Sequence, residues 1–347
     1  MKGMDYTDAD RAVFKEEFDG WLPDRIFDVH THLFPAAAFK PGSDDGPKSI
    51  YNKFGGQHTI EQFMDITGRL LPGRKVESLS FGTPGLNIDI EKSSEYSGAI
   101  SDHKTHFALS LITPQCRIED VRRRIEKYDL LGYKPYRNMV KGKKGDEVEI
   151  FDMLTAEQLE YANEKGLILM MHIPKSLRIA DPVNQKQMLE LCDRYPDIKV
   201  IFAHIGRAYF MRCIEGMLDG IASRPNAYVD TSPCCQWEVL EYTFNHFPRE
   251  RIMFASDAPV GWVRGKQIEV NHQYAYLVGE DYRVGSALYD AERVLNYTFF
   301  FYEQLRAAKK AAKRLGLSRR EIENYFYNTA STLVKSVDAH VHRNKAK

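Results

Sequence analysis

The segment Arg25-Ile-Phe-Asp-Val-His-Thr-His-Leu-Phe34 is an apolar run between Pro23 and Pro35 that carries two histidines, His30 and His32. Side chains on a β-strand alternate between faces with period two, so both imidazoles leave the same face. Two imidazoles placed in this way lie close enough to share one metal ion. The segment therefore predicts a strand that ends in part of a metal site.

Three later apolar runs also end in a residue of the metal-ligand type. They are Met170-Met-His172, Phe202-Ala-His204 and Phe254-Ala-Ser-Asp257. In a parallel barrel the carboxyl ends of all strands open on one face, so residues that end different strands converge although they are far apart in sequence. The four strand ends together predict one site.

Eight strands are expected, with helical patterns between most of them, at residues 25–33, 75–82, 105–112, 130–136, 167–173, 198–204, 226–231 and 251–256. The late strands are near-continuous apolar runs without alternation, which is typical of strands covered on both faces. Strands spaced by helices favour a parallel sheet over an antiparallel sandwich. The sequence therefore predicts an α/β fold, a (β/α)₈ TIM barrel.

The whole chain, residues 1–347, is expected to form a single barrel domain. The barrel is placed at about residues 25–260, and extra C-terminal helices at about residues 287–335. The connection after the first strand, residues 35–58, is long and contains Pro41-Gly-Ser-Asp-Asp-Gly-Pro47, whose residue types are typical of turns. This insertion is either a lid over the site or a surface excursion.

Composition excludes several classes of protein. Lys plus Arg and Asp plus Glu balance at 48 each, which argues against a nucleic-acid partner held by phosphate attraction. No run approaches the roughly 18 apolar residues of a membrane span, and residues 1–10 lack a signal-peptide core. The five cysteines are odd in number and sparse, so no disulfide framework is expected. A cytoplasmic protein with no membrane partner is predicted; a homo-oligomer is left open.

The converging residues suit one divalent cation. Three imidazoles and a carboxylate are supplied by His30, His32, His172 and Asp257. This set favours zinc, with manganese or iron as alternatives, and leaves room for a water or substrate oxygen. A carboxylate beside that water can also take its proton, so Asp257 is predicted to be both ligand and general base. Burying so many titratable groups without a cation would be costly.

The order of these motifs resembles the amidohydrolase superfamily, in which His-x-His, two single histidines and Ser-Asp end successive strands. The branch it is most similar to is the amidohydrolase-related proteins that include the aminocarboxymuconate semialdehyde decarboxylase type. The resemblance runs from about Arg25 to Leu333. It includes Tyr327-Asn-Thr-Ala-Ser-Thr-Leu333, which is similar to the closing Asn-Ala helix of the family.

The resemblance implies that one metal ion is bound by His30, His32, His172 and Asp257. It implies that His204 lies beside the metal and acts in acid–base or electrostatic catalysis. Lys134 ends the fourth predicted strand, where binuclear members carry a carboxylated lysine that bridges two metals. Two metals and a carboxylated Lys134 therefore stay open, beside the interpretation of Lys134 as a substrate-facing cation or a structural ion-pair partner.

Cations at or just past strand ends are expected to hold an anionic small-molecule substrate, and the candidates are Lys134, Arg137 and Arg207. The predicted function is a metal-dependent hydrolase that acts on an amide, ester or lactone of a small, carboxylated molecule. A non-oxidative decarboxylase (carboxy-lyase) or hydratase on the same barrel is the second hypothesis. The third hypothesis is a barrel that binds a small molecule without catalysis. Loss of a metal ligand or of the general base would indicate such a protein, but the sequence has all of these residues.

Overall fold

The computed structural model describes residues 5–42, 48–283 and 285–345. The barrel strands follow one another in chain order. They are β1 (Arg25–His32), β2 (Lys75–Phe81), β3 (His106–Ala108), β4 (Ser110–Ile112), β5 (Gly132–Pro135), β6 (Ile168–Met171), β7 (Lys199–Phe202), β8 (Ala227–Asp230) and β9 (Ile252–Met253). All neighbouring pairs in the two sheets β1-β2-β3 and β4-β5-β6-β7-β8-β9 are parallel.

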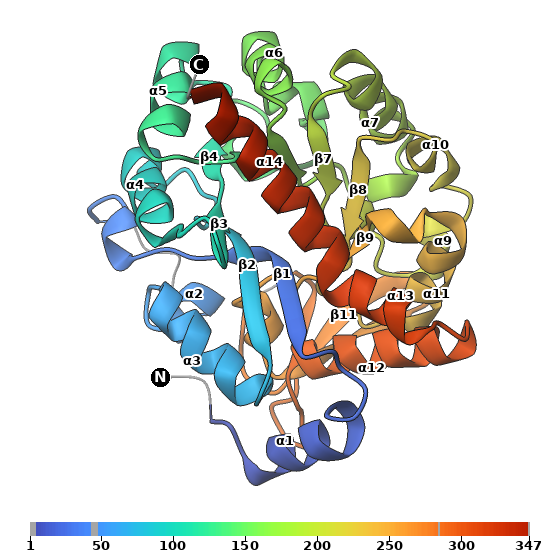
Figure 1. The fold of residues 1–347 in the computed structure, drawn as a ribbon. Coiled ribbons are helices and arrows are strands. Elements are labelled where there is room, and N and C mark those ends of the chain that lie inside the picture. Colours follow the sequence, from blue (N-terminus) through green and yellow to red (C-terminus); the bar gives the residue numbers. More distant parts are fainter. Residues whose placement is uncertain (1–4, 43–47, 284, 346–347) are drawn as a thin grey trace.

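Two seams close these sheets into one barrel (Figure 1). Leu109 alone separates β3 from β4, and its N–H donates to the Ser80 carbonyl at 2.8 Å, so the two segments act as one strand. At the other seam the Asp257 N–H donates to the His30 carbonyl at 3.0 Å. The His32 N–H donates to the Ala258 carbonyl at 2.8 Å. The predicted parallel eight-stranded barrel is confirmed, with each predicted strand represented.

Helices cover the outside of the strands (Figure 1). The main ones are α3 (Ile60–Leu70), α4 (Ile90–Ile100), α5 (Ile118–Lys127), α6 (Ala156–Lys165), α7 (Pro182–Arg194) and α11 (Trp237–His246). Thr59 and Thr155 cap α3 and α6 with reciprocal side-chain hydrogen bonds, and Gly166 ends α6 in the left-handed conformation. The late strands β6, β7 and β9 are buried along nearly their whole length, which explains their near-continuous apolar sequences.

Short helices lie before the barrel, in the connections between its strands and after it: α1 (Asp8–Val13), α2 (Ile50–Lys53), α8 (His204–Arg207), α9 (Met211–Ile214), α10 (Asp219–Ala222) and α13 (Arg319–Glu323). The two long helices α12 (Phe300–Arg314) and α14 (Thr329–Lys345) follow the barrel. α14 crosses the amino-terminal end of the barrel (Figure 1), where Lys335 pairs with Glu77 of β2. None of the helices in the described ranges is long and apolar enough to cross a membrane.

The prediction of a helical region over residues 287–335 is wrong at its start and end. A small sheet of β10 (Gly265–Val270), β11 (Gln273–Val278) and β12 (Ala287–Tyr289) follows the barrel, and helix begins only at Phe300. Leu288 pairs with Leu277, so tertiary pairing overrides the helix propensity of this stretch. At the other end α14 continues to Lys345.

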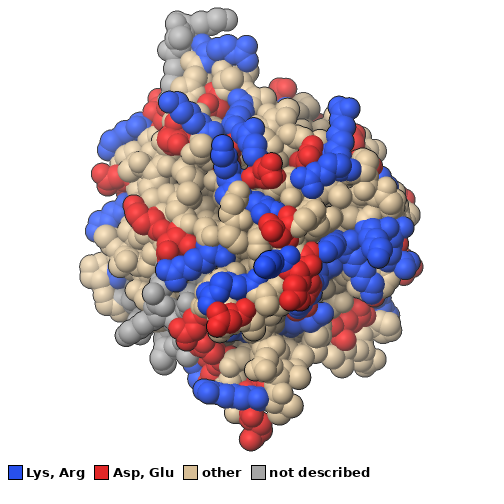
Figure 2. Space-filling model, turned by 60° about the horizontal axis from the view of Figure 1, so that its bottom comes forward, with Lys and Arg blue, Asp and Glu red and all other residues tan. Residues whose placement is uncertain are grey.

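The insertion after β1 returns to the barrel through mutual backbone hydrogen bonds of Phe34 and His58, at 2.8 and 2.9 Å. A bridge between Ser49 and Arg283 joins it to the small sheet region. The turn at residues 43–47, which belongs to the suggested lid, lies outside the described residues. On the face drawn in Figure 2, basic and acidic side chains are interspersed, in keeping with the charge balance of the sequence.

Candidate metal centre at the carboxyl end of the barrel

Three predicted ligands meet at the carboxyl end of the barrel. His30 and His32 end β1, and Asp257 follows β9 with a φ of 55°, a left-handed conformation in the turn after the strand. The Nε2 atoms of His30 and His32 both lie 3.3 Å from Oδ1 of Asp257. All three residues are buried, so the period-two spacing and the strand-end positions place the side chains together as expected.

Hydrogen bonds fix how both imidazoles present their nitrogens. Nδ1 of His30 lies 2.9 Å from a carboxylate oxygen of Asp230, and Nδ1 of His32 lies 2.9 Å from the Gly82 carbonyl. Those oxygens only accept, so each Nδ1 carries a proton, and in a neutral ring Nε2 offers a lone pair. Burial lowers the pKa of His30 to about 3, which keeps its ring neutral.

The donor set fits a divalent cation. Two Nε2 lone pairs face one carboxylate oxygen, an arrangement that repels unless a positive charge lies among the three atoms. Imidazole nitrogens oriented by an acceptor on the far ring nitrogen are the usual form of metal-binding histidines. His30, His32 and Asp257 could therefore hold a metal of the zinc or manganese kind.

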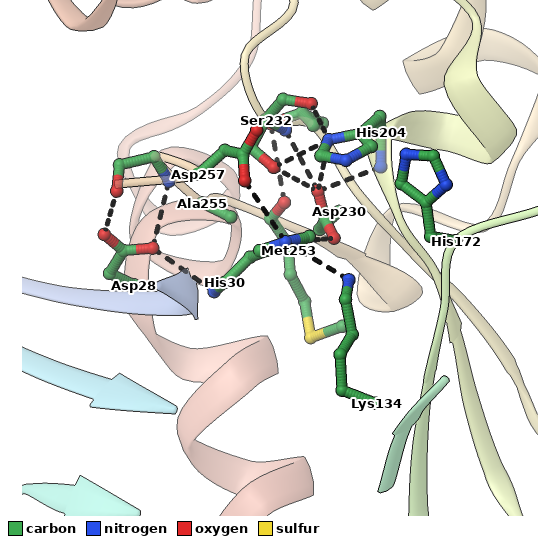
Figure 3. Close-up of polar contacts among 12 residues, drawn as sticks. Asp28, His30, Lys134, His172, His204, Asp230, Ser232, Met253, Ala255 and Asp257 are labelled. Carbon is green, nitrogen blue, oxygen red and sulfur yellow. Dashed lines mark hydrogen bonds and ion pairs between the residues drawn. The ribbon is translucent and has the colours of Figure 1, made fainter. Parts of the chain in front are cut away.

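His204 lies beside this group (Figure 3). Its ring centroid is 4.9 Å from that of His30, and its Nδ1 donates to the Ser232 carbonyl, which leaves Nε2 as the free nitrogen. Burial lowers the pKa of His204 below its usual value. Because His30, His204 and Asp230 also offer ligand atoms within 4.8 Å of one another, His204 could act either beside a metal or on it.

His172 reaches the same end of the barrel next to His204, at 5.4 Å between ring centroids. Its ring contacts the Tyr136 ring, with centroids 4.2 Å apart and planes tilted by 35°, and its Nε2 lies 3.2 Å from the Tyr136 hydroxyl. Nδ1 of His172 is buried without a hydrogen-bond partner among the described residues. Within those ranges His172 belongs to no group of three close ligand atoms, so the structure brings it near the centre but not onto Asp257.

Asp230, at the end of β8, is a residue that the sequence prediction missed. Its carboxylate accepts hydrogen bonds from Nδ1 of His30, from the His204 N–H at 3.1 Å, and from the N–H and hydroxyl of Ser232 at 3.1 and 2.7 Å (Figure 3). These partners outweigh burial and hold the pKa of Asp230 well below its usual value. Tyr-Val-Asp230 ends an apolar run as Asp257 does, and that signal could have identified it.

Asp28 of β1 connects this strand to the segment after β9. It accepts hydrogen bonds from the N–H of Ser256 at 2.9 Å, from the Ser256 hydroxyl, and from the His30 N–H at 3.3 Å. Burial raises the pKa of Asp28 to about 7. The contact ties β1 to the segment that carries Asp257, and so fixes the separation of the ligands.

Lys134 is fully buried, and its Nζ lies 3.3 Å from Nε2 of His30 and 4.7 Å from the centre of the Phe81 ring. Burial lowers the pKa of Lys134 to about 8, against the opposing charges of Asp230 and Asp257. The amine thus faces the metal ligands rather than solvent. Its carboxylation and its contact with substrate both stay predictions.

The two predicted arginines differ in their surroundings. Nη1 of Arg207 donates to the carbonyls of Ile173, Pro174 and Lys175 at 3.2, 3.2 and 2.8 Å, so it supports the loop that follows His172. Arg137 is half-buried, and its side chain has no hydrogen bond or ion pair within the described part of the chain. Arg137 is therefore the better placed of the two to meet an anion.

A cavity of about 750 Å³ lies over this end of the barrel. Its walls come from the loops after β1, β2, β5 and β9, and include Tyr51, Pro84, Tyr136, Asn138 and Val260. Tyr136 is shared by the cavity and by the His172 contact. Tyr136 is therefore the cavity-lining residue that contacts a candidate ligand.

The family model for amidohydrolases matches residues 118–333, more than half of the chain. The chain belongs to the amidohydrolase family. The matched segment holds His172, His204 and Asp257, whereas His30 and His32 precede it and are joined to the centre by the geometry described above. Members of this family are enzymes. A separate comparison with curated protein sequences gives no match.

Solved structures of other amidohydrolases share the barrel. An amidohydrolase from Burkholderia multivorans with bound zinc is 12% identical, covers 88% of this chain and 98% of its own, and has a TM-score of 0.57. A 4-oxalomesaconate hydratase from Rhodopseudomonas palustris is 15% identical, with coverages of 92% and 99% and a TM-score of 0.52. At such identities the likeness shows the fold alone.

A dihydroxybenzoic acid decarboxylase from a Polaromonas species, with bound manganese and the inhibitor 2-nitroresorcinol, is 11% identical. It covers 90% of this chain and 97% of its own, with a TM-score of 0.51. The Burkholderia structure thus contains zinc and the Polaromonas structure manganese, and this chain has candidate histidine and aspartate ligands of its own.

Proposed function

We propose that this member of the family is a metal-dependent hydrolase that cleaves an amide, ester or lactone bond of a small, carboxylated molecule. The observation that carries the proposal is the convergence of the Nε2 lone pairs of His30 and His32 on one oxygen of Asp257. We include His172 as the fourth ligand, since its buried Nδ1 has no other partner in the described ranges.

A divalent cation held by His30, His32 and Asp257 would supply a Lewis acid, able to polarise the scissile carbonyl and to lower the pKa of water toward neutrality. Asp257 takes the proton of the attacking water. Its Oδ1 lies 3.3 Å from Nε2 of both His30 and His32, so the carboxylate is placed to accept that proton.

His204 then holds or delivers a proton at its Nε2, because its Nδ1 is occupied by the Ser232 carbonyl. Asp230 binds both the His204 backbone and the His30 ring, so it keeps the acid–base group and the ligand at a fixed separation. Arg137, which lies between the cavity-lining residues Tyr136 and Asn138, binds the remote carboxylate of the substrate.

A carboxy-lyase or hydratase acting on an aromatic acid is the second candidate, and the aromatic surroundings of His204 favour it. Tyr209 lies 6.1 Å from the His204 ring and 5.0 Å from Tyr274, and the Arg178 guanidinium lies 4.3 Å from the Tyr274 ring. Such surfaces stack well on a planar substrate. A binding protein without activity would not need the ionised Asp257 beside the histidines.

The test is a screen of the zinc- and manganese-loaded protein against lactones, amides, esters and aromatic acids in ¹⁸O-labelled water. The hydrolase proposal expects ¹⁸O in a newly formed carboxylic acid. Release of CO₂ from an aromatic acid without ¹⁸O incorporation would instead support the lyase. Asp257→Asn, folded but lacking the base, is the matched control and should be inactive. Absence of any turnover by folded, metal-loaded protein would contradict both.

A further inference from the structure

A second group of histidines and carboxylates lies at the opposite end of the barrel. His103 lies in the loop before β3, Asp129 in the loop before β5, and Asp338 and His342 on α14. Loops that precede the strands of a parallel barrel lie at its amino-terminal face, away from the candidate metal centre. We call these four residues the base cluster.

Two imidazoles in the base cluster point at one carboxylate oxygen. Nε2 of His342 lies 2.8 Å from Oδ2 of Asp129, and Nε2 of His103 lies 3.5 Å from the same atom. The two rings stand at 81° to one another with centroids 4.9 Å apart. Three ligand-type atoms thus lie within 4.8 Å of one another.

Asp338 fixes the far nitrogen of both rings. Its Oδ1 lies 2.7 Å from Nδ1 of His103, and its backbone carbonyl lies 2.7 Å from Nδ1 of His342. Both oxygens only accept, so both Nδ1 atoms carry a proton, and in a neutral ring each Nε2 is a lone pair. Those lone pairs would repel Asp129 unless both rings are protonated or a cation lies between the three atoms.

The same design occurs at the carboxyl end, where His30 and His32 each have an acceptor on Nδ1 and share an oxygen of Asp257. We propose that the base cluster is a second divalent-metal site, with His103, His342 and Asp129 as ligands and Asp338 orienting both rings. Two imidazoles and a carboxylate suit an ion of the zinc kind.

Accessibility and position fit a structural rather than a catalytic metal. The side chains of His103, Asp129 and His342 are 24%, 33% and 38% exposed, so a cation can enter and water can complete its shell. The ligands come from two loops and from the last turns of α14. A metal there would fasten α14 to the base of the barrel, and its binding free energy would add to fold stability.

The first experiment counts metal ions. Chelator-treated full-length protein is titrated with Zn²⁺ by calorimetry, and bound zinc is measured by mass spectrometry. The wild type should bind one equivalent more than His103→Ala/His342→Ala. The matched control His340→Ala, an exposed histidine of the same helix, should bind as many ions as the wild type. Equal zinc content in the wild type and the double variant would overturn the proposal.

A second experiment isolates the base cluster from the candidate active site. In His30→Ala/His32→Ala protein, Co²⁺ should still produce visible d–d absorption, and Zn²⁺ should still raise the thermal unfolding temperature and release protons. Both effects should be lost when Asp129→Asn is added, a change that keeps the shape of the side chain. A colourless cobalt titration of the folded His30→Ala/His32→Ala protein would show that the rings are simply protonated, and would refute the site.

Discussion

Nδ1 of His30 lies 2.9 Å from a carboxylate oxygen of Asp230, in a contact from which solvent is excluded. This hydrogen bond sets which nitrogen of His30 faces Asp257, and the same carboxylate holds the backbone of His204. One aspartate therefore positions both a proposed ligand and a proposed acid–base group. Asp230 is a positioning residue in the proposed mechanism, because it acts through these two histidines rather than on metal or substrate.

Asp230→Asn should lower the affinity for zinc at the carboxyl end by about 10- to 100-fold, since the neutral amide no longer strengthens the His30 ligand. Affinity is measured by competition with a chromophoric chelator in a His103→Ala/His342→Ala background, and folding by circular dichroism. Asp193→Asn, a surface carboxylate paired with Arg224, is the control and should bind zinc normally. Unchanged affinity in Asp230→Asn would remove the positioning role.

His204→Ala should leave the metal content equal to that of the wild type but reduce turnover about 10²–10⁴-fold, because the acid–base group is lost while the ligands stay. Turnover is measured on the substrate that the screen identifies, and zinc by mass spectrometry. Loss of a metal equivalent along with activity would instead make His204 a ligand and support a binuclear centre with Lys134.

Arg137→Met should raise KM for a carboxylated substrate by the equivalent of a lost charge-assisted hydrogen bond, about 1.5–3 kcal/mol, with metal binding intact. For a neutral analogue of the substrate, such as its methyl ester, the substitution should raise KM much less. If Arg137→Met changes the KM for the acid and the KM for the ester by the same factor, the anion is held elsewhere.

Arg207→Met should act mainly on stability. The guanidinium donates to three carbonyls of the loop after His172, so its removal takes these hydrogen bonds away and should lower the free energy of unfolding by about 1–3 kcal/mol. Urea titration followed by fluorescence measures this difference. A variant that is as stable as the wild type but has a raised KM would contradict the structural role, and would indicate that Arg207 binds substrate.

Glu77 gives a prediction for pH. Its carboxylate accepts hydrogen bonds from Arg25, Tyr327 and Lys335. Burial raises its pKa, but these donors outweigh burial and hold the pKa below the usual value. The folded state therefore binds the proton less tightly than the unfolded state, and stability from Glu77 is full above about pH 4.3 and is lost as the pH falls through the folded pKa.

Glu77→Gln should accordingly lower the free energy of unfolding by about 1–3 kcal/mol at neutral pH. This difference in unfolding free energy between variant and wild type, the gap, should narrow below about pH 4.3. Urea unfolding across the pH range measures the gap. Glu160→Gln, an exposed glutamate of α6, is the control and should show almost no gap at any pH. A gap for Glu77→Gln that does not change with pH would contradict the ionic interpretation.

The barrel could be predicted from sequence because its signals are local. Unbroken apolar runs such as Leu167–Met171 mark strands covered on both faces, and a histidine or aspartate at the end of such a run marks the carboxyl end. His30, His32 and Asp257 were found in this way, and the structure brings them to one point. The amidohydrolase resemblance is confirmed by the family match.

What could not be predicted from sequence depends on contacts between distant residues. The strand Ala287–Tyr289 has a helix-prone composition and becomes a strand only by pairing with β11. The partners of Arg207 are backbone carbonyls of another loop, which no pattern of side chains reveals. His103 and His342 are far apart in the chain, and only the crossing of α14 beneath the barrel brings them together.

The measurement that tests the proposed metal centre most directly is a crystal structure of the zinc-loaded protein with anomalous scattering recorded at the zinc edge. We expect a peak at the carboxyl end of the barrel, about 2.0–2.3 Å from Nε2 of His30, Nε2 of His32 and a carboxylate oxygen of Asp257. Fully loaded crystals in which these three side chains contact one another with no anomalous peak among them would contradict the metal centre.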